Sequence, residues 1–291
     1  MIFMQPEQDM SRSSVIYESD TGSEDRLGQS NKFKIQASFE IARPPPKFFL
    51  RLGPKLLLQI QQVAQNHRPV PVLEIWQPPF CKSNLTREFH HAVKLRSGDV
   101  YVTLGESYIT SSTQQKDVSN LEQPSDNATA HGDIIAAICH DEEESHIHFR
   151  NARCSWRAST QMTGHDQSII SYRFTMSSRD GDLPDQGRMV LQWEKRRKEH
   201  VPAGSVDADQ FVFLLIDRQV KKKSRIATMT TDGFKVVVRK SSILDGLKAC
   251  FDLMEPIGPE DRHSSRNLET WLYTLTLTLG VLVRHKEGWL N

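Results

Sequence analysis

The sequence predicts a mainly β fold, either a sandwich or a barrel. Short runs rich in Val, Ile, Leu and Phe recur along the chain, and several of them alternate apolar and polar residues with a period of two. Connections rich in Gly, Asp, Pro and Ser separate these runs, which is typical of antiparallel strands. Strand and helix patterns do not alternate, so a Rossmann-like α/β fold is not expected.

Composition bounds the protein class. The chain has 291 residues, of which 37% are hydrophobic, and this is enough apolar material for a core. Its 37 Lys and Arg residues nearly balance its 36 Asp and Glu residues, which argues against a general nucleic-acid-binding protein. The four cysteines are widely spaced and form no C-x-x-C pair, so neither a zinc ribbon nor a thioredoxin-type motif is predicted.

The chain divides into a tail and one domain. Residues 1–31 are rich in Ser, Asp and Glu with few apolar residues, which predicts a disordered tail. Residues 32–291 are predicted to form a single domain, with the polar segment 111–133 as a long flexible loop. No secretory signal is recognised, so an intracellular protein, cytoplasmic or nuclear, is expected. The longest apolar run, 270–283, is too short to span a bilayer, and no transmembrane helix is predicted.

The strands are predicted in order from their apolar runs and from the turns between them. The run 55–63 is rich in the helix formers Leu, Gln and Lys, so a short helix is an alternative there. Its length and the apolar run that follows favour a hairpin with 70–77. The strand pattern also continues over 90–110 on both sides of a predicted turn at 97–99, with 100–104 alternating at a period of two. The other predicted strands lie within 33–41, 55–63, 70–77, 134–140, 145–156, 168–178, 188–198, 211–223, 224–233 and 234–241.

The C-terminal part has a different pattern. Apolar residues at helical spacing predict a helix over 241–256, which Pro256 ends. In 268–283, Leu and Thr alternate as in a strand, yet the uncharged run is long for a strand, and Asn267 and Glu269 make a fair helix start. A segment that is apolar all round suits a helix buried on every side, and we expect this core element to be a helix. The side chains expected to be deeply buried are Trp271, Leu272, Leu275, Leu279 and Val283.

One cluster, Cys139–His148, carries residues capable of chemistry. His146 and His148 share a face on a strand, and Cys139 and His140 can oppose them across the turn, so zinc ligands are gathered there. Their spacing matches no metal motif, and we predict neither a metal site nor a cofactor. No nucleophile or phosphate-binding motif occurs, and no catalytic residue is predicted. A non-enzymatic binding or scaffold protein is favoured. The alternative is an enzyme, with or without a metal ion, that has a barrel-mouth site near this cluster.

Basic residues supply the second feature. From residue 188 to residue 248 there are 14 basic and 7 acidic residues. If the strands that end at Lys198 and Lys223 lie antiparallel with one strand intervening, these clusters can share one end of the sheet. Such a patch would bind anionic lipid head groups, so an anionic membrane surface is the predicted partner, with no specific nucleic acid and no identified protein partner. The predicted ligand-binding residues are Lys195, Arg196, Arg197, Lys198, Lys221, Lys222, Lys223 and Arg225.

Four segments carry a family resemblance. KFFLRLGPKLLLQIQQV, RPVPVLEI, SRIATMT and VLVRHKEGWL resemble a group of uncharacterised fungal proteins. The order of many strands followed by an apolar, Trp-bearing C-terminal segment also resembles, more remotely, the tubby C-terminal-like fold of tubby, LURP-one-related and scramblase proteins. That resemblance implies a closed antiparallel β-barrel around a hydrophobic C-terminal helix, formed by 268–283. It also implies phosphoinositide binding as in tubby proteins, although no binding residue can be matched.

Overall fold

The computed structural model describes most of the chain that follows the predicted tail. The predicted tail 1–31 and the predicted loop 111–133 lie outside the described residues. The described residues are 35–45, 53–64, 67–79, 83–85, 89, 93–105, 134–141, 144–150, 152, 154–163, 169–177, 189–197, 209–238, 241–254 and 265–290.

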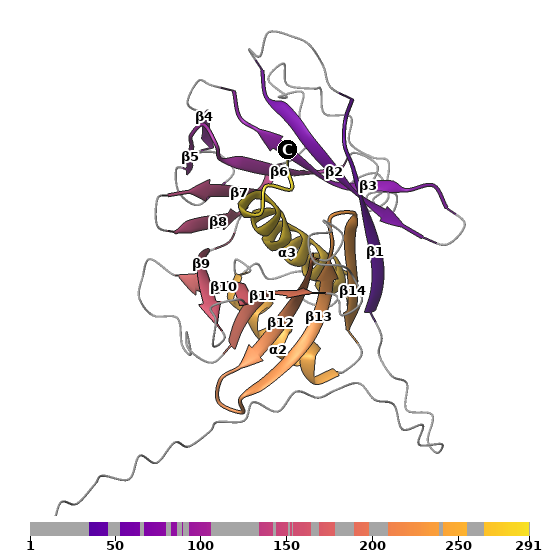
Figure 1. The fold of residues 1–291 in the computed structure, drawn as a ribbon, viewed down its shortest axis with the longest axis vertical. Coiled ribbons are helices and arrows are strands. Elements are labelled where there is room, and N and C mark those ends of the chain that lie inside the picture. The colour runs from indigo at the N-terminus through magenta and orange to yellow at the C-terminus, as the bar shows by residue number, and fades with distance from the viewer. Residues whose placement is uncertain are drawn as a thin grey trace, which may run out of the picture.

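A closed antiparallel barrel dominates the fold (Figure 1). Among the described residues, twelve strands follow one another around it in the order β1-β14-β13-β12-β11-β10-β9-β8-β7-β6-β3-β2. They are β1 (Ile35–Ala42), β2 (Lys55–Val63), β3 (Val70–Gln77), β6 (Val100–Leu104), β7 (Ile134–His140), β8 (Ser145–Phe149), β9 (Ser155–Thr163), β10 (Ile169–Ser177), β11 (Met189–Arg197), β12 (Asp209–Asp217), β13 (Lys222–Met229) and β14 (Gly233–Val238). Closure pairs β1 with both β2 and β14, so no strand of the barrel has a free edge.

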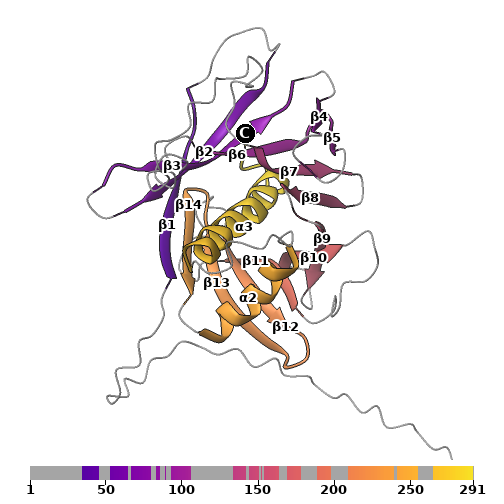
Figure 2. The ribbon, with the colours of Figure 1, turned by 180° about the vertical axis from the view of Figure 1, so that it is seen from behind.

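Two helices follow the last strand. Helix α2 (Ser241–Met254) lies across one end of the barrel, and helix α3 (Ser265–Lys286) runs through the interior (Figures 1 and 2). We call the end where α3 finishes the C-terminal mouth, and the end with α2 the opposite mouth. The turns β7–β8 and β13–β14 lie at the C-terminal mouth, and the turn β12–β13 lies at the opposite mouth.

The predicted fold class is confirmed as a mainly β, closed antiparallel barrel with a C-terminal helix. The strand expected within 145–156 is wrong, because β8 ends at Phe149 and a new strand begins at Ser155. The strand β5 (Val93–Leu95) lies within the predicted strand region 90–110, but β4 (Ser83–Leu85), with which it forms a short hairpin, was not expected. Its apolar residues Val93 and Leu95 pack with Tyr101 on the outer face of the barrel.

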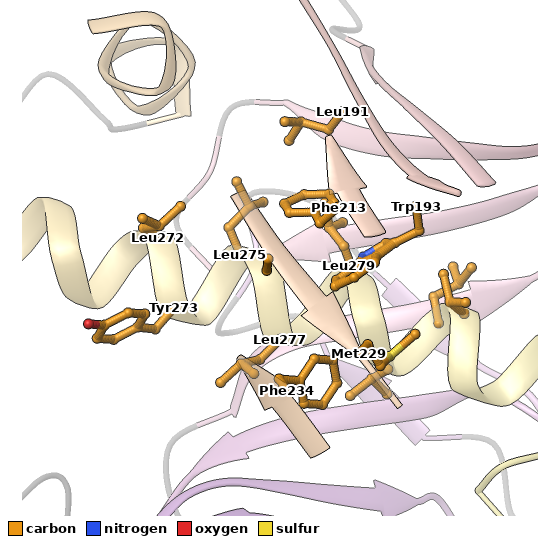
Figure 3. Packing of buried hydrophobic residues seen from close by; sticks show 14 of the residues in the cluster. Leu191, Trp193, Phe213, Met229, Phe234, Leu272, Tyr273, Leu275, Leu277 and Leu279 are labelled. Carbon is orange, nitrogen blue, oxygen red and sulfur yellow. The ribbon is translucent and has the colours of Figure 1, made fainter. Parts of the chain in front are cut away.

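The interior is filled by α3 and by aromatic side chains from the strands. Figure 3 shows Trp193 of β11 and Phe213 of β12 beside Leu275 and Leu279 of α3. The two rings stack with centroids 4.6 Å apart. On another side of the helix, Phe39 of β1 meets the ring of Tyr273 edge to face, at 5.3 Å. The helix therefore contacts strands that are far apart around the barrel.

The residues expected to be buried are nearly all buried. Leu272, Leu275, Leu279 and Val283 have at most 1% of their surface exposed. Trp271 is only half-buried, because it lies near the start of α3, where its ring meets the edge of Phe251 of α2. No helix among the described residues is long and apolar enough to cross a membrane.

The glycine in the middle of α3 marks the tightest contact between helix and barrel. A Cβ atom at Gly280 would lie 2.3 Å from Cε1 of Phe234 and 3.4 Å from Sδ of Met229. A real Cβ cannot approach an aromatic carbon so closely. The small residue therefore lets the helix backbone lie directly against β13 and β14.

We predict that Gly280→Ala destabilises the protein by about 1–2 kcal/mol, because overpacking a core outweighs the roughly 1 kcal/mol that Ala contributes to an isolated helix. Urea denaturation measures the change. Phe234→Leu in the same chain should remove the clash, so the double variant should lose at least about 1 kcal/mol less than the sum of the single losses. A Gly280→Ala variant more stable than the wild type would contradict this packing.

Candidate functional site

The two basic clusters lie at opposite ends of β12, so the expectation that they share one end of the sheet is wrong. Arg197 at the end of β11 pairs with Asp209 at the start of β12. Asp217 at the other end of β12 pairs with Lys222. The predicted strand 211–223 includes the three lysines 221–223. In the structure β12 ends at Asp217, and β13 begins at Lys222.

The turn between β12 and β13 was missed because it lacks the usual turn residues. Asp217 closes it by accepting hydrogen bonds on Oδ1 from the backbone nitrogens of Gln219, at 2.9 Å, and Val220, at 3.2 Å. Lys221 takes a left-handed conformation, with φ of 53°, at a place where Gly or Asn is more common. Asp217 is a turn-forming residue, but it lies inside the apolar run 211–223 that predicts a strand.

The first basic cluster is divided between the two faces of β11. Lys195 lies in the C-terminal mouth, with Nζ 2.9 Å from Oδ2 of Asp209 and 2.9 Å from Oε2 of Glu287. Burial lowers the pKa of Lys195, but its hydrogen bonds to these carboxylates outweigh burial and leave the pKa above its ordinary value. Both oxygens belong to this chain, so Lys195 is engaged within the protein.

The rest of the first cluster offers little to a ligand in the described structure. On the outer face of β11, Arg196 donates from Nη2 to Oε1 of Glu194, at 3.1 Å. The backbone of Arg197 continues the strand, while its side chain and the whole of Lys198 lie outside what the structure describes. A predicted ligand-binding role for Arg197 and Lys198 therefore stays a prediction.

The second cluster is more open. Lys221, Lys222 and Arg225 are exposed. Lys223 is half-buried, with Nζ 3.4 Å from Oε2 of Glu194, so it shares that carboxylate with the first cluster. The exposed cations of this cluster are thus the part of the predicted site that remains accessible.

The cluster Cys139–His148 does not converge on one point. Cys139 pairs with His146 on the outer face, whereas His140 pairs with Ser145 and turns inward toward α3. Burial, followed by the charges of Asp99 and Asp141, raises the pKa of the Cys139 thiol to about 12, which leaves almost no thiolate near neutral pH. In the part of the chain that the structure describes, no three His, Cys, Asp or Glu side chains are arranged to hold a metal ion.

His140 and Ser145 have the side-chain types of a base and a nucleophile. Nδ1 of His140 lies 3.1 Å from Oγ of Ser145. Ser145, however, has only 1% of its surface exposed, so a substrate cannot reach its hydroxyl. Burial, with the neighbouring His285 and Lys286, also lowers the pKa of His140 to about 4, which makes its imidazole a weak base. The pair therefore lacks both the accessible hydroxyl and the basic imidazole that nucleophilic catalysis needs.

The C-terminal mouth holds a polar network that the sequence did not predict. Glu287, just beyond α3, accepts a hydrogen bond on Oε1 from the Tyr172 hydroxyl, at 2.6 Å, while its other oxygen binds Lys195. Burial and this hydrogen bond raise the pKa of Tyr172 well above its ordinary value. The network ties the end of α3 to β10 and β11, on the far side of the mouth from β1.

Arg284 fastens the same end of the helix to β13 and β14. Its side chain is fully buried, and its two terminal nitrogens donate to the backbone oxygens of Thr230, at 2.7 Å, and Thr231, at 2.8 Å. Its guanidinium carbon lies 5.5 Å from the ring centroid of Trp289, within cation–π range. Burial lowers the pKa of Arg284 to about 10, so the side chain is still charged at neutral pH.

Comparison with protein-family models, curated proteins and solved structures finds no match to this chain. Function therefore has to be inferred from the geometry of the described residues.

We predict that Arg284→Met destabilises the protein by about 2–4 kcal/mol, because it removes two hydrogen bonds that a fully buried guanidinium donates to half-buried carbonyl oxygens. Replacing a buried charge by an apolar side chain can leave stability unchanged, but only when the polar partners of the charge are also replaced. The partners of Arg284 are backbone carbonyl groups, which a side-chain substitution cannot remove. Urea denaturation measures the loss. The exposed neighbour Lys286→Met is the control and should change stability by less than about 0.5 kcal/mol. Equal stability of the two variants would contradict the role of Arg284.

Proposed function

We propose that this protein is a non-enzymatic binding protein that docks reversibly on anionic membrane surfaces through the β12–β13 hairpin. The hairpin surface consists of Arg218, Val220, Lys221 and Lys222, with Arg225 beside it on β13. The turn forms the end of the barrel away from the C-terminus, where it can meet a surface without obstruction from the C-terminal segment (Figure 1).

The observation that carries the proposal is an exposed aliphatic side chain among cations. Val220 has 68% of its surface exposed, the largest fraction among the exposed large hydrophobic residues of the described chain. Arg218, Lys221 and Lys222 flank it and are exposed as well. A cationic rim around an apolar tip matches a bilayer surface, where anionic head groups cover hydrocarbon.

The expected strength of docking is modest. Each basic side chain near an anionic leaflet contributes about 1 kcal/mol, so Arg218, Lys221 and Lys222 together contribute about 3 kcal/mol. Salt screens these contributions over a Debye length of about 8 Å at physiological ionic strength. The cytoplasmic leaflet, which carries the anionic lipids, is the expected surface.

The architecture supports a relationship with the tubby C-terminal-like fold. A closed antiparallel barrel around a hydrophobic C-terminal helix is what the resemblance to that fold implied. Proteins of the tubby group bind phosphoinositides, so an anionic lipid ligand suits the proposal. The relationship itself is part of what we propose, and a phosphoinositide preference is one outcome of the test below.

An enzyme with a site near Cys139–His148 is less well supported. The outward cysteine has a raised pKa, and the serine beside His140 is buried. Neither group offers an accessible, activated nucleophile.

We predict that the wild-type protein sediments with phosphatidylcholine vesicles containing phosphatidylserine or a phosphoinositide, and that high salt releases it. The variant Arg218→Ser, Lys221→Asn, Lys222→Thr should bind at least about tenfold more weakly, because it removes about 3 kcal/mol of attraction. Asn suits the left-handed position of Lys221, so the turn should persist.

The matched control removes three exposed cations elsewhere, by Lys55→Thr, Lys94→Thr and Lys235→Thr. This control should bind as the wild type does, because it keeps the cations of the hairpin and loses only cations that do not contact the membrane. Equal sedimentation of the hairpin variant and the wild type at low salt would overturn the proposal, as would sedimentation of neither. Stronger binding to phosphoinositide than to phosphatidylserine vesicles, at equal total charge, would favour the tubby-like ligand.

A further inference from the structure

We propose that the C-terminal segment, residues 284–290, is an acid-released latch: it closes the C-terminal mouth while the stacked His140 and His285 are neutral, and it leaves the mouth when they become charged. This regulation does not depend on the proposed membrane docking, which uses the opposite end of the barrel.

The stack joins the end of a barrel strand to the end of the central helix. The ring of His140, the last residue of β7, lies nearly parallel to the ring of His285, with 18° between their planes and 4.2 Å between centroids. Two neutral imidazoles stack favourably at this distance. Two imidazolium ions so close together repel each other, and little water can screen them when both are half-buried.

The negative charge near the pair does not outweigh burial and the charge of Lys286. Asp99, before β6, is buried, and its two oxygens already accept hydrogen bonds from the backbone nitrogens of Arg96, at 2.6 Å, and His140, at 2.8 Å. Asp141 is exposed and paired with Arg96. Nε2 of His140 is buried without a hydrogen-bond partner within the described structure, so no acceptor awaits a proton there. Among the described residues, Lys286 and Asp99 are the charged groups that act on the pair. Asp141 follows His140 in the chain and is paired with Arg96, and Glu287 follows Lys286 and binds Tyr172 and Lys195.

The pKa directions agree with this geometry. Burial, then His285 and Lys286, lowers the pKa of His140 from 6.5 to about 4. Burial and Lys286 also lower the pKa of His285, with Asp99 opposing them. A histidine whose pKa is lower in the closed state favours closure fully above pH 6.5, and that contribution is lost as the pH falls from 6.5 toward 4.

The latch covers apolar surface in the mouth. Trp289 meets the ring of Phe211 edge to face, at 5.5 Å, and its carbonyl accepts a hydrogen bond from Nη2 of Arg43, at 3.2 Å. Leu290 is buried in the same core. Gly288 has a positive φ of 73°, so the chain turns back sharply after the helix and folds over the mouth. Release of the segment would expose Phe211 and the inner wall of the barrel.

Hydrogen exchange of the backbone amides of residues 284–290 tests the latch in the full-length protein. From the pKa change of His140 alone, from 6.5 when released to about 4 when closed, the opening equilibrium should rise about tenfold between about pH 7.5 and about pH 5.5. Exchange rates corrected for the intrinsic effect of pH should rise by the same factor, while the amides of β12 stay protected.

Four variants test the role of the histidine pair. The double variant His140→Phe, His285→Phe keeps stacked rings that do not titrate, so it should abolish the pH response. If this double variant does not fold, the single variant His285→Gln replaces it in the test and should weaken the pH response. His67→Gln, at the opposite end of the barrel, is the control and should respond like the wild type. Glu287→Gln should also keep the response, because its carboxylate is not the sensor. The latch would be overturned if the amides of 284–290 in the wild type kept the same protection down to about pH 5. It would also be overturned if Glu287→Gln lost the pH response while the double histidine variant kept it.

Discussion

The burial of helix α3 inside the barrel is the constraint on which the rest of the structure depends. Barrel diameter grows with strand number, and about eight strands already enclose as much as their own side chains can fill. A barrel of twelve strands therefore needs a filler. A helix about 10–12 Å across with its side chains fills such a space. The 22 residues of α3 extend for roughly 33 Å, enough to run from one mouth to the other.

Burial on every side explains features that would be unfavourable elsewhere. Thr276 and Thr278 are buried in α3, Gly280 lies against Phe234, and Arg284 keeps its charge inside the protein by binding backbone carbonyls. Gly280 and Arg284 thus adjust the helix to the barrel wall beside it. Because α3 also ends at the C-terminal mouth, the residues after it are positioned to close that mouth.

The sequence predicted most of the barrel because alternation and turn residues are local signals. Strands such as β6 and β14 follow from their own residues alone. The Leu and Thr alternation of 274–279 was misleading, since it resembles a strand although the segment is helical. In a helix buried all round, Leu and Thr are both inside, so periodicity carries no information about the surface. The length of the run and the family resemblance predicted the helix.

The candidate sites depend on contacts that local patterns do not carry. The basic runs are visible in the sequence, but the end of the barrel on which each lies depends on one turn that Asp217 and the left-handed Lys221 form. The partners of Lys195 and His140 are Glu287 and His285, which follow them in the sequence only after several intervening strands. Such long-range pairs become predictable only when the closure of the barrel around α3 is known.

Nuclear Overhauser contacts from two distant parts of α3 in the full-length protein test the central helix most directly. The account predicts contacts between the rings of Tyr273 and Phe39, near one mouth, together with contacts between the rings of His285 and His140, at the other. It also predicts that the amides of the buried part of α3, residues 272–283, exchange as slowly as those of the barrel strands, since both open only on global unfolding. Absence of both ring contacts, with α3 amides that exchange faster than those of β12, would show that the helix does not fill the barrel.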